Sequence, residues 1–329
     1  MSAALDPHIA ELVDQLNAMG LPSISTMPIE ELRSRSRPRG DETPADWWGA
    51  IESTEQLSIL AGGSSLDARL YRPLADNAVA GAVILFIHGG GWVTGDLDGA
   101  DGVARMLAAE SGCAVVSAHY RLAPEDPFPA AIDDVAAALR WLRENASAHG
   151  FDPRLIAVSG DSAGGNLAAV LAQQDSAPSL AAQLLIYPAV SGRADGFRSF
   201  IENARAPMLD QPSYARFLAW YGGDPEDPRF APLRSAEAAG SVPAVIGVAG
   251  FDPLRDEGID YAERLRRSGG RVVLRRYDSL VHGFFAFAPV SAAAESASRQ
   301  LCRDIGSLLR KQQEQLAPPA DTRITRILT

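Results

Sequence analysis

The chain has 329 residues, 47% of them hydrophobic, and a formal net charge of −11. This length suits one α/β domain with an insertion, and it allows a large core without disulfides or structural metal ions. The acidic balance argues against nucleic acid or an anionic membrane surface as a partner.

Signals for export and membrane insertion are missing from the sequence. Acidic residues at positions 6, 11 and 14 interrupt the N-terminus, which predicts neither a signal peptide nor an anchor. No segment reaches the roughly 18 apolar residues of a membrane span. Cys113 and Cys302 lie in a strand-like and a helical pattern, so we expect buried thiols. These features predict a cytoplasmic protein.

Residues 1–50 differ from the rest of the chain in pattern. An amphipathic helix comes first, with Ile9, Leu12, Val13 and Leu16 on its apolar face. A helix of this length is unstable alone, so the apolar face is expected to dock on the rest of the protein. The basic run at 33–39 is flanked by acidic residues, which predicts a solvated, mobile connector.

Eight strands follow, with helices between most of them. The first two resemble a hairpin, and the next six are short apolar runs typical of a parallel sheet that is buried on both faces. The strands are predicted at 54–60, 66–72, 82–87, 114–118, 155–159, 183–187, 242–249 and 271–277, and the helices at 130–145, 166–173, 255–267 and 292–310. This alternation predicts a doubly wound, mostly parallel sheet of eight strands flanked by helices.

Residues 191–235 interrupt the alternation, dividing the core into 51–190 and 236–312. Long excursions from an α/β sheet are often lids, and the alternative is a surface subdomain without ligand contacts. Within this segment, Met208, Phe217 and Trp220 are the candidate substrate contacts. The tail at 313–329 has no apolar period and is predicted to be disordered.

Two glycine-rich motifs follow predicted strands. The segment 160–164, Gly-Asp-Ser-Ala-Gly, fits the G-x-S-x-G pattern that holds a nucleophilic serine, Ser162, on a strand-to-helix turn. The segment 88–91, His-Gly-Gly-Gly, fits a loop whose backbone N–H groups line an oxyanion hole. A G-x-S-x-G match alone is weak evidence, but the two motifs in this order favour a serine hydrolase.

A serine hydroxyl needs a histidine base, which a carboxylate orients in turn. In hydrolases with this type of turn, the chain order is serine, acid, histidine. His282 is the only histidine after Ser162, and it follows the last predicted strand. Asp252 is the first carboxylate after the seventh strand, whereas Asp256 and Glu257 fall inside the next predicted helix. We therefore predict a triad of Ser162, Asp252 and His282.

The oxyanion hole is expected to use backbone donors. Ala163 follows the nucleophile at the start of a helix, and Gly89 and Gly90 lack side chains that would keep the backbone away from an oxyanion. His88 precedes the serine in the chain, so we expect it to brace the glycine loop rather than transfer protons.

Together these motifs resemble the hormone-sensitive-lipase-like group of α/β-hydrolases, also called the bacterial family IV esterases. The matching segments are 88–92, 120–125, 128–130, 160–166, 252–258 and 282–284. The resemblance implies an α/β-hydrolase fold with a helical cap, formed here by 1–50 and 191–235. It also implies hydrolysis of short- to medium-chain acyl esters, no cofactor and no metal, with Ser162, Asp252, His282, Gly89, Gly90 and Ala163 in the roles given above.

One departure from the family concerns positions 119 and 126. The family usually has an acidic residue where this chain has His119 and a histidine where it has Asp126, which looks like an ion pair with its ends exchanged. The cap is the part that matches least.

Other functions remain open at this point. An amidase or peptidase would use the same triad, and nothing in the sequence decides against it. A small-molecule receptor on this fold is disfavoured because such receptors have lost the catalytic histidine, whereas His282 is present. The expected partner is a small acyl ester, and a homodimer is left open.

Overall fold

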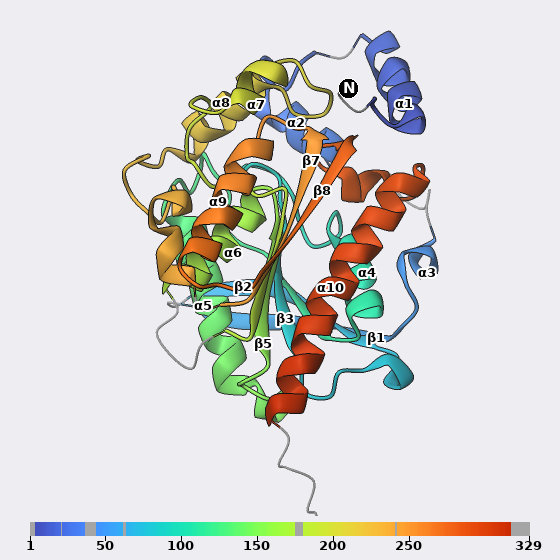
Figure 1. The fold of residues 1–329 in the computed structure, drawn as a ribbon, viewed down its shortest axis with the longest axis vertical. Coiled ribbons are helices and arrows are strands. Elements are labelled where there is room, and N and C mark those ends of the chain that lie inside the picture. Colours follow the sequence, from blue (N-terminus) through green and yellow to red (C-terminus); the bar gives the residue numbers. More distant parts are fainter. Residues whose placement is uncertain are drawn as a thin grey trace, which may run out of the picture.

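A computed structural model describes residues 4–20, 22–36, 44–61, 64–174, 180–240 and 242–316. Its centre is one eight-stranded sheet with the order β1-β2-β4-β3-β5-β6-β7-β8 (Figure 1). Strand β2 pairs antiparallel with both β1 and β4, and the remaining pairs are parallel. The predicted eight-stranded, mostly parallel sheet is therefore confirmed. The strands are β1 (Ile51–Ala61), β2 (Ser64–Pro73), β3 (Val83–Ile87), β4 (Ala114–Ala118), β5 (Ile156–Asp161), β6 (Ala182–Ile186), β7 (Ala244–Phe251) and β8 (Val272–Val281).

Helices cover both faces of the sheet. Two helices match the predicted bounds, and a helix over Asp101–Ser111 was not predicted. The α-helices are α1 (Pro7–Ala18), α2 (Ile29–Ser36), α3 (Ala45–Trp48), α4 (Asp101–Ser111), α5 (Ala130–Asn145), α6 (Ala163–Gln174), α7 (Arg198–Glu202), α8 (Gln211–Tyr221), α9 (Arg255–Arg267) and α10 (Ala292–Leu316). Short 3₁₀ turns are η1 (Ala75–Asn77), η2 (Ser147–His149), η3 (Pro232–Ala239) and η4 (Phe284–Phe287).

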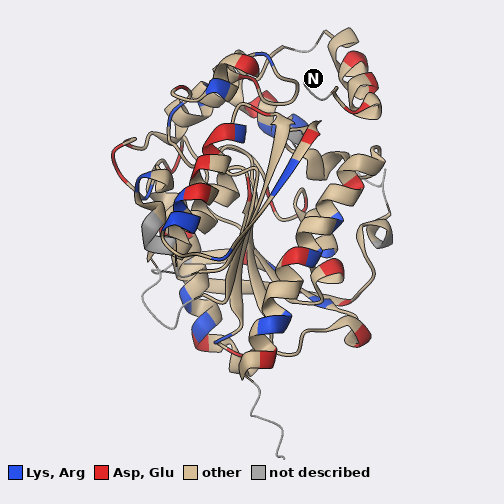
Figure 2. Ribbon diagram, viewed as in Figure 1, with Lys and Arg blue, Asp and Glu red and all other residues tan. Residues whose placement is uncertain are grey.

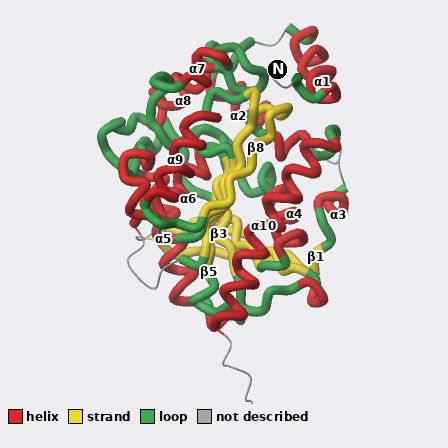
Figure 3. Tube along the Cα trace, in the orientation of Figure 1, coloured by secondary structure: helices red, strands yellow, loops and turns green. Residues whose placement is uncertain are grey.

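The core forms two apolar layers, one on each face of the sheet. Alternate residues of β3 divide between them: Leu85 belongs to the layer that includes α5, α6 and α9, and Phe86 belongs to the layer that includes α4 and α10. Figure 3 shows this helix–sheet–helix arrangement, and Figure 2 shows the charged residues gathered on the surrounding helices and loops. Such two-sided burial explains why the central strands are short apolar runs.

Helices α1 and α2 from 1–50 and helices α7 and α8 from 191–235 lie near the carboxyl ends of β7 and β8, whereas α3 lies beside α4 (Figure 1). Helix α1 docks as expected, because Ile9 is fully buried and the backbone N–H of Asp6 donates to the carbonyl of Ser279 at 2.9 Å. Helix α8 is joined to the N-terminal segment by Arg216, which donates to the carbonyls of Ile24 and Met27, both at 2.8 Å. The two excursions are therefore packed against each other.

Two sequence predictions were wrong in this region and at the tail. The basic run predicted as a mobile connector begins inside helix α2, where Arg33 donates to the carbonyls of Val93 and Ala123 and to the carboxylate of Glu125. Its acidic partner is remote in sequence, so the local charge pattern did not reveal it. At the other end, α10 continues to Leu316, so residues 313–316 are helical. Residues 37–39 and 317–329 lie outside the described ranges.

Candidate active site

Ser162 occupies the sharp turn between β5 and α6. Its φ of 53° lies in the left-handed region, which residues with a side chain rarely adopt. A Cβ on Gly160 would overlap the carbonyl of Gly164, and a Cβ on Gly164 would overlap that of Ile87. Both glycines of the motif are therefore required by close backbone approach. The turn places the serine at the carboxyl end of a central strand, where ligands of open α/β sheets bind.

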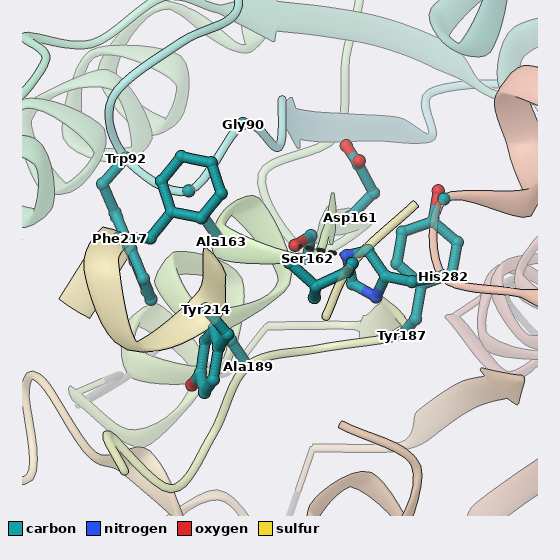
Figure 4. Close-up of a pocket in the computed structure, with 13 residues that line it drawn as sticks. Gly90, Trp92, Asp161, Ser162, Ala163, Tyr187, Ala189, Tyr214, Phe217 and His282 are labelled. Atoms are coloured by element: carbon teal, nitrogen blue, oxygen red, sulfur yellow. Dashed lines mark hydrogen bonds between the residues drawn. The ribbon is translucent and has the colours of Figure 1, made fainter. Parts of the chain in front are cut away.

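The structure brings the three predicted triad residues together. His282 follows β8 and Asp252 follows β7, so the two side chains come from neighbouring strand ends, and His282 lies between Asp252 and Ser162. The Nε2 atom of His282 lies 2.9 Å from the hydroxyl of Ser162 (Figure 4). The Nδ1 atom of His282 lies 2.8 Å from Oδ2 of Asp252. Because a carboxylate accepts the Nδ1 proton, Nε2 is left as the acceptor that faces the serine hydroxyl.

Hydrogen bonds hold Asp252 in place. The Asp252 side chain is buried, and the backbone N–H of Leu254 donates to its Oδ1 at 2.8 Å. The amide of Asn203, at the end of α7, donates to the backbone carbonyls of Gly250 and Asp252 at 3.1 and 3.0 Å. Sequence reasoning missed Asn203, because nothing local indicates that its amide reaches another strand end. A carboxylate fixed in this way orients the imidazole of His282.

The glycine loop after β3 lies beside the serine, and two of the three residues predicted for the oxyanion hole line the pocket there. Gly90, Gly91 and Ala163 line the pocket of Ser162. Ala163 is the first residue of α6, so its N–H has no acceptor within the helix. The prediction of Gly89 as an oxyanion donor was wrong, because its N–H donates to Oδ1 of Asp161 at 2.8 Å. An N–H that is already bonded inside the protein is unavailable to an oxyanion.

Asp161 links the serine turn to the glycine loop. The side chain accepts the Gly89 N–H, and burial raises the pKa of Asp161 to about 6, although that N–H and His282 act in the opposite direction. A Cβ on Gly89 would overlap this carboxyl group, which explains the glycine. Asp161 fills a variable position of G-x-S-x-G, so the motif itself carried no signal for this role.

The interpretation of His119 and Asp126 as an exchanged ion pair was also wrong. Nδ1 of His119 lies 3.1 Å from Nε2 of His88, whereas the carboxylate of Asp126 lies 3.7 Å from the guanidinium of Arg121. The two residues thus have separate partners, one in the glycine loop and one on the neighbouring loop.

The pocket at Ser162 is a small cavity of about 130 Å³. Trp92, Tyr214 and Phe217 lie on one side of the serine, with His282 and Tyr187 on the other (Figure 4). Aromatic rings around a few polar groups are typical of sites for small apolar ligands.

Of the three candidate contacts in 191–235, the structure places one in this pocket. Phe217 lines it and packs against Gly91. Met208 instead lines a neighbouring cavity of about 770 Å³ between the N-terminal helices and residues 204–213, and Trp220 stacks on the guanidinium of Arg216 at 4.2 Å. Residues missed by sequence reasoning are Leu209 and Tyr214, which also line the serine pocket.

The chain belongs to the α/β-hydrolases, in their hormone-sensitive-lipase-like group. A family profile described as alpha/beta hydrolase fold matches residues 84–286. The carboxylesterase NlhH of Mycobacterium tuberculosis is 44% identical over 280 residues, which cover 82% of this chain and 86% of NlhH. The ethyl acetate hydrolase of Pseudomonas putida is 36% identical over 309 residues, 89% of this chain and 95% of the relative.

Solved structures agree with these sequence relatives. A thermostable esterase from Pseudomonas putida superimposes with a TM-score of 0.86 at 29% identity, covering 94% of this chain and 99% of the other. The hyperthermophilic esterase of Pyrobaculum calidifontis has a TM-score of 0.83 at 35% identity, covering 94% and 100%. These relatives make the chain a carboxylesterase that acts on small-molecule esters. Among the described helices, every one is too short or too polar to cross a membrane.

Proposed function

We propose that the enzyme hydrolyses short- to medium-chain acyl esters through a triad of Ser162, His282 and Asp252. The observation that carries the proposal is the continuous hydrogen-bonded path from the serine hydroxyl to the buried carboxylate, with steps of 2.9 and 2.8 Å. This is the geometry that a general base needs in order to take the serine proton during attack on a carbonyl carbon.

The reaction has two halves. Ser162 attacks the ester carbonyl while His282 takes its proton, and the alcohol leaves with that proton as the acyl-enzyme forms. Water then gives a proton to His282 and attacks the acyl-enzyme, and the carboxylic acid is released as the proton returns to Ser162. In both halves the charge on the carbonyl oxygen is held by backbone N–H groups of Gly90, Gly91 and Ala163. Buried Asp252 stabilises the imidazolium that forms each time.

The acyl group is proposed to have about two to eight carbons, since the serine pocket is small and closed by Trp92, Tyr214 and Phe217. The relative named for ethyl acetate supports the short end of this range. We further propose that 1–50 and 191–235 together form a cap over the site, because Leu209, Tyr214 and Phe217 reach the pocket from the second segment. An amide substrate would use the same groups.

The test combines a substrate panel with a nucleophile variant. Purified protein is assayed on p-nitrophenyl esters from acetate to palmitate, and on the corresponding anilides to measure amide cleavage. Ser162→Ala should fold normally and lose at least about 10⁴-fold in kcat, whereas Ser307→Ala on the exposed face of α10 should be unchanged. A fluorophosphonate probe should label the wild type at Ser162 alone. Near-normal turnover by Ser162→Ala, or a maximum at palmitate, would contradict the proposal.

A further inference from the structure

His88 binds the glycine loop on one side and His119 on the other. Its Nδ1 atom lies 2.8 Å from the carbonyl oxygen of Gly89, and its Nε2 atom lies 3.1 Å from Nδ1 of His119. The ring is buried and stacks on Tyr120, whose hydroxyl donates to the carbonyl of His88 at 2.9 Å. Both ring nitrogens of His88 are therefore engaged within the protein.

These contacts fix where the protons lie. A carbonyl oxygen can only accept, so Nδ1 of His88 carries a proton and donates it to Gly89. In the neutral ring Nε2 is then an acceptor, and the proton of the next hydrogen bond must come from Nδ1 of His119. His119 thus donates to His88 and stabilises the one neutral tautomer that can hold the Gly89 carbonyl.

Charge around the pair agrees with this assignment. Burial is the main cause that lowers the pKa of His88 to about 4; the hydrogen bond to Gly89 and the charge of Asp96 act in the opposite direction, and the neighbouring His119 acts with burial. Burial also lowers the pKa of His119, against Asp96, Asp67 and Asp134, which raise it. Asp96 acts on both rings, whereas Asp67 and Asp134 act on His119 alone. His88 is therefore the ring that stays neutral at neutral pH, as an acceptor at Nε2 must be.

The Gly89 carbonyl matters because it shares a peptide group with the N–H of Gly90. In a planar trans peptide the C=O and N–H point in opposite directions. The hydrogen bond from His88 therefore sets the direction of the Gly90 N–H, and Gly90 lines the pocket of Ser162. The other side of Gly89 is held as well, since its own N–H is bonded to Asp161.

We infer that His119 is a positioning residue for the oxyanion hole, acting by donating a proton to Nε2 of His88 and so fixing the Gly89–Gly90 peptide. The inference rests on the proposed role of Gly90 as an oxyanion donor. This role explains why the chain has His119 where the family usually has an acidic residue. An acidic residue would accept from Nε2 and would require a doubly protonated His88, whereas His119 donates to Nε2 of a neutral His88.

Two variants of nearly equal size separate hydrogen bonding from packing. The side-chain nitrogen of His119→Asn can take the place of Nδ1 and donate, whereas His119→Leu can neither donate nor accept. We expect His119→Leu to lower kcat about 10-fold with little change in KM, a part of the 10²–10³ that follows removal of an oxyanion donor. His119→Asn should recover most of that loss. His149→Leu, outside the site, is the matched control and should keep wild-type kinetics.

A second readout does not depend on turnover. In ¹⁵N-labelled wild-type protein at pH 7.5, NMR should show His88 protonated at Nδ1 and not at Nε2, and His119→Leu should give a mixture of tautomers. Protonation at Nε2 in the wild type would overturn the inference, as would equal kcat for the Leu and Asn variants. If Ser162→Ala instead kept its activity, the proposed function would fail while the tautomer result would still stand.

Discussion

Glu257 is buried at the start of α9, close to the active site but outside the triad. Its Oε1 accepts the N–H groups of Val190 and Ser191 at 2.6 and 3.2 Å, and its Oε2 lies 2.6 Å from the hydroxyl of Ser191. That hydroxyl is also 3.0 Å from the carbonyl of Arg193, and its single proton cannot serve both oxygens. A protonated Glu257 that donates to Ser191 satisfies all of these contacts.

Burial raises the pKa of Glu257 from 4.5 to about 8, and the nearby carboxylate of Asp252 adds to the effect, while the bonds from Val190 and Ser191 oppose it. Between pH 4.5 and about pH 8, Glu257 holds a proton in the folded protein that it has released in the unfolded chain. The free energy of unfolding therefore falls as pH rises through this window, and it levels off above pH 8. Glu257→Gln, which mimics the protonated acid, should remove this fall.

The size of the effect follows from proton linkage. One proton of difference changes the free energy of unfolding by about 1.4 kcal/mol per pH unit. Below pH 6.5 the raised pKa of Asp161 and the lowered pKa of His88 also contribute, so the informative range is pH 6.5 to 8. Over that range the wild type should lose roughly 2 kcal/mol of stability through Glu257, whereas the variant should lose almost none.

Urea unfolding at several pH values measures this difference directly. Glu263→Gln, on the exposed face of the same helix, is the matched control and should retain the wild-type slope. The amide of Glu257→Gln still accepts the Val190 and Ser191 N–H groups, so ester hydrolysis at pH 7 should stay close to that of the wild type. A variant with the wild-type slope, or one less stable than the wild type at pH 8.5, would refute the assignment of a protonated Glu257.

Two further predictions concern substrate selection. Phe217→Ala should enlarge the serine pocket and shift the preferred p-nitrophenyl ester to a longer acyl chain, and an unchanged chain-length profile would show that Phe217 does not limit the acyl group. Deleting residues 1–40 should leave a core that still reacts with a fluorophosphonate at Ser162, because the triad lies outside the deleted segment. Its kcat/KM on the preferred ester should fall at least about 10-fold, because the site excludes water less well. Full activity of the truncated protein would show that the N-terminal segment has no role in substrate selection.

Much of the fold was predictable because it depends on local patterns. Helices α5 and α9 have the predicted bounds, since Pro129 precedes the first and the Ser-Gly-Gly segment at 268–270 follows the second. Helix α4 was missed, because Met106 and Leu107 are the only large residues on its buried face and a glycine at position 102 weakens the pattern. Ser162, Asp252 and His282 could be found because motif, strand end and chain order each restricted the choice.

The errors at Arg33 and Gly89 share a physical cause, which is the direction of polar groups that meet across long sequence distances. The sequence around Arg33 predicts a solvated run, whereas in the structure its guanidinium donates to the carbonyls of Val93 and Ala123. The sequence predicts Gly89 as an oxyanion donor, whereas its N–H donates to Asp161, 72 positions away. Composition and spacing contain no information about where an N–H points, so such roles need coordinates.

The residues proposed for the chemistry and those proposed for substrate selection come from different parts of this enzyme. The groups proposed to break the ester bond stand at strand ends, where motifs fix them within a few residues. The walls proposed to select the acyl group come from Leu209, Tyr214 and Phe217. Their position depends on how α8 is held against the N-terminal segment by Arg216. Since that contact joins positions about 190 residues apart, substitutions in either cap segment can alter substrate range while leaving the triad intact. Differences in substrate preference among relatives should therefore arise mainly in these segments.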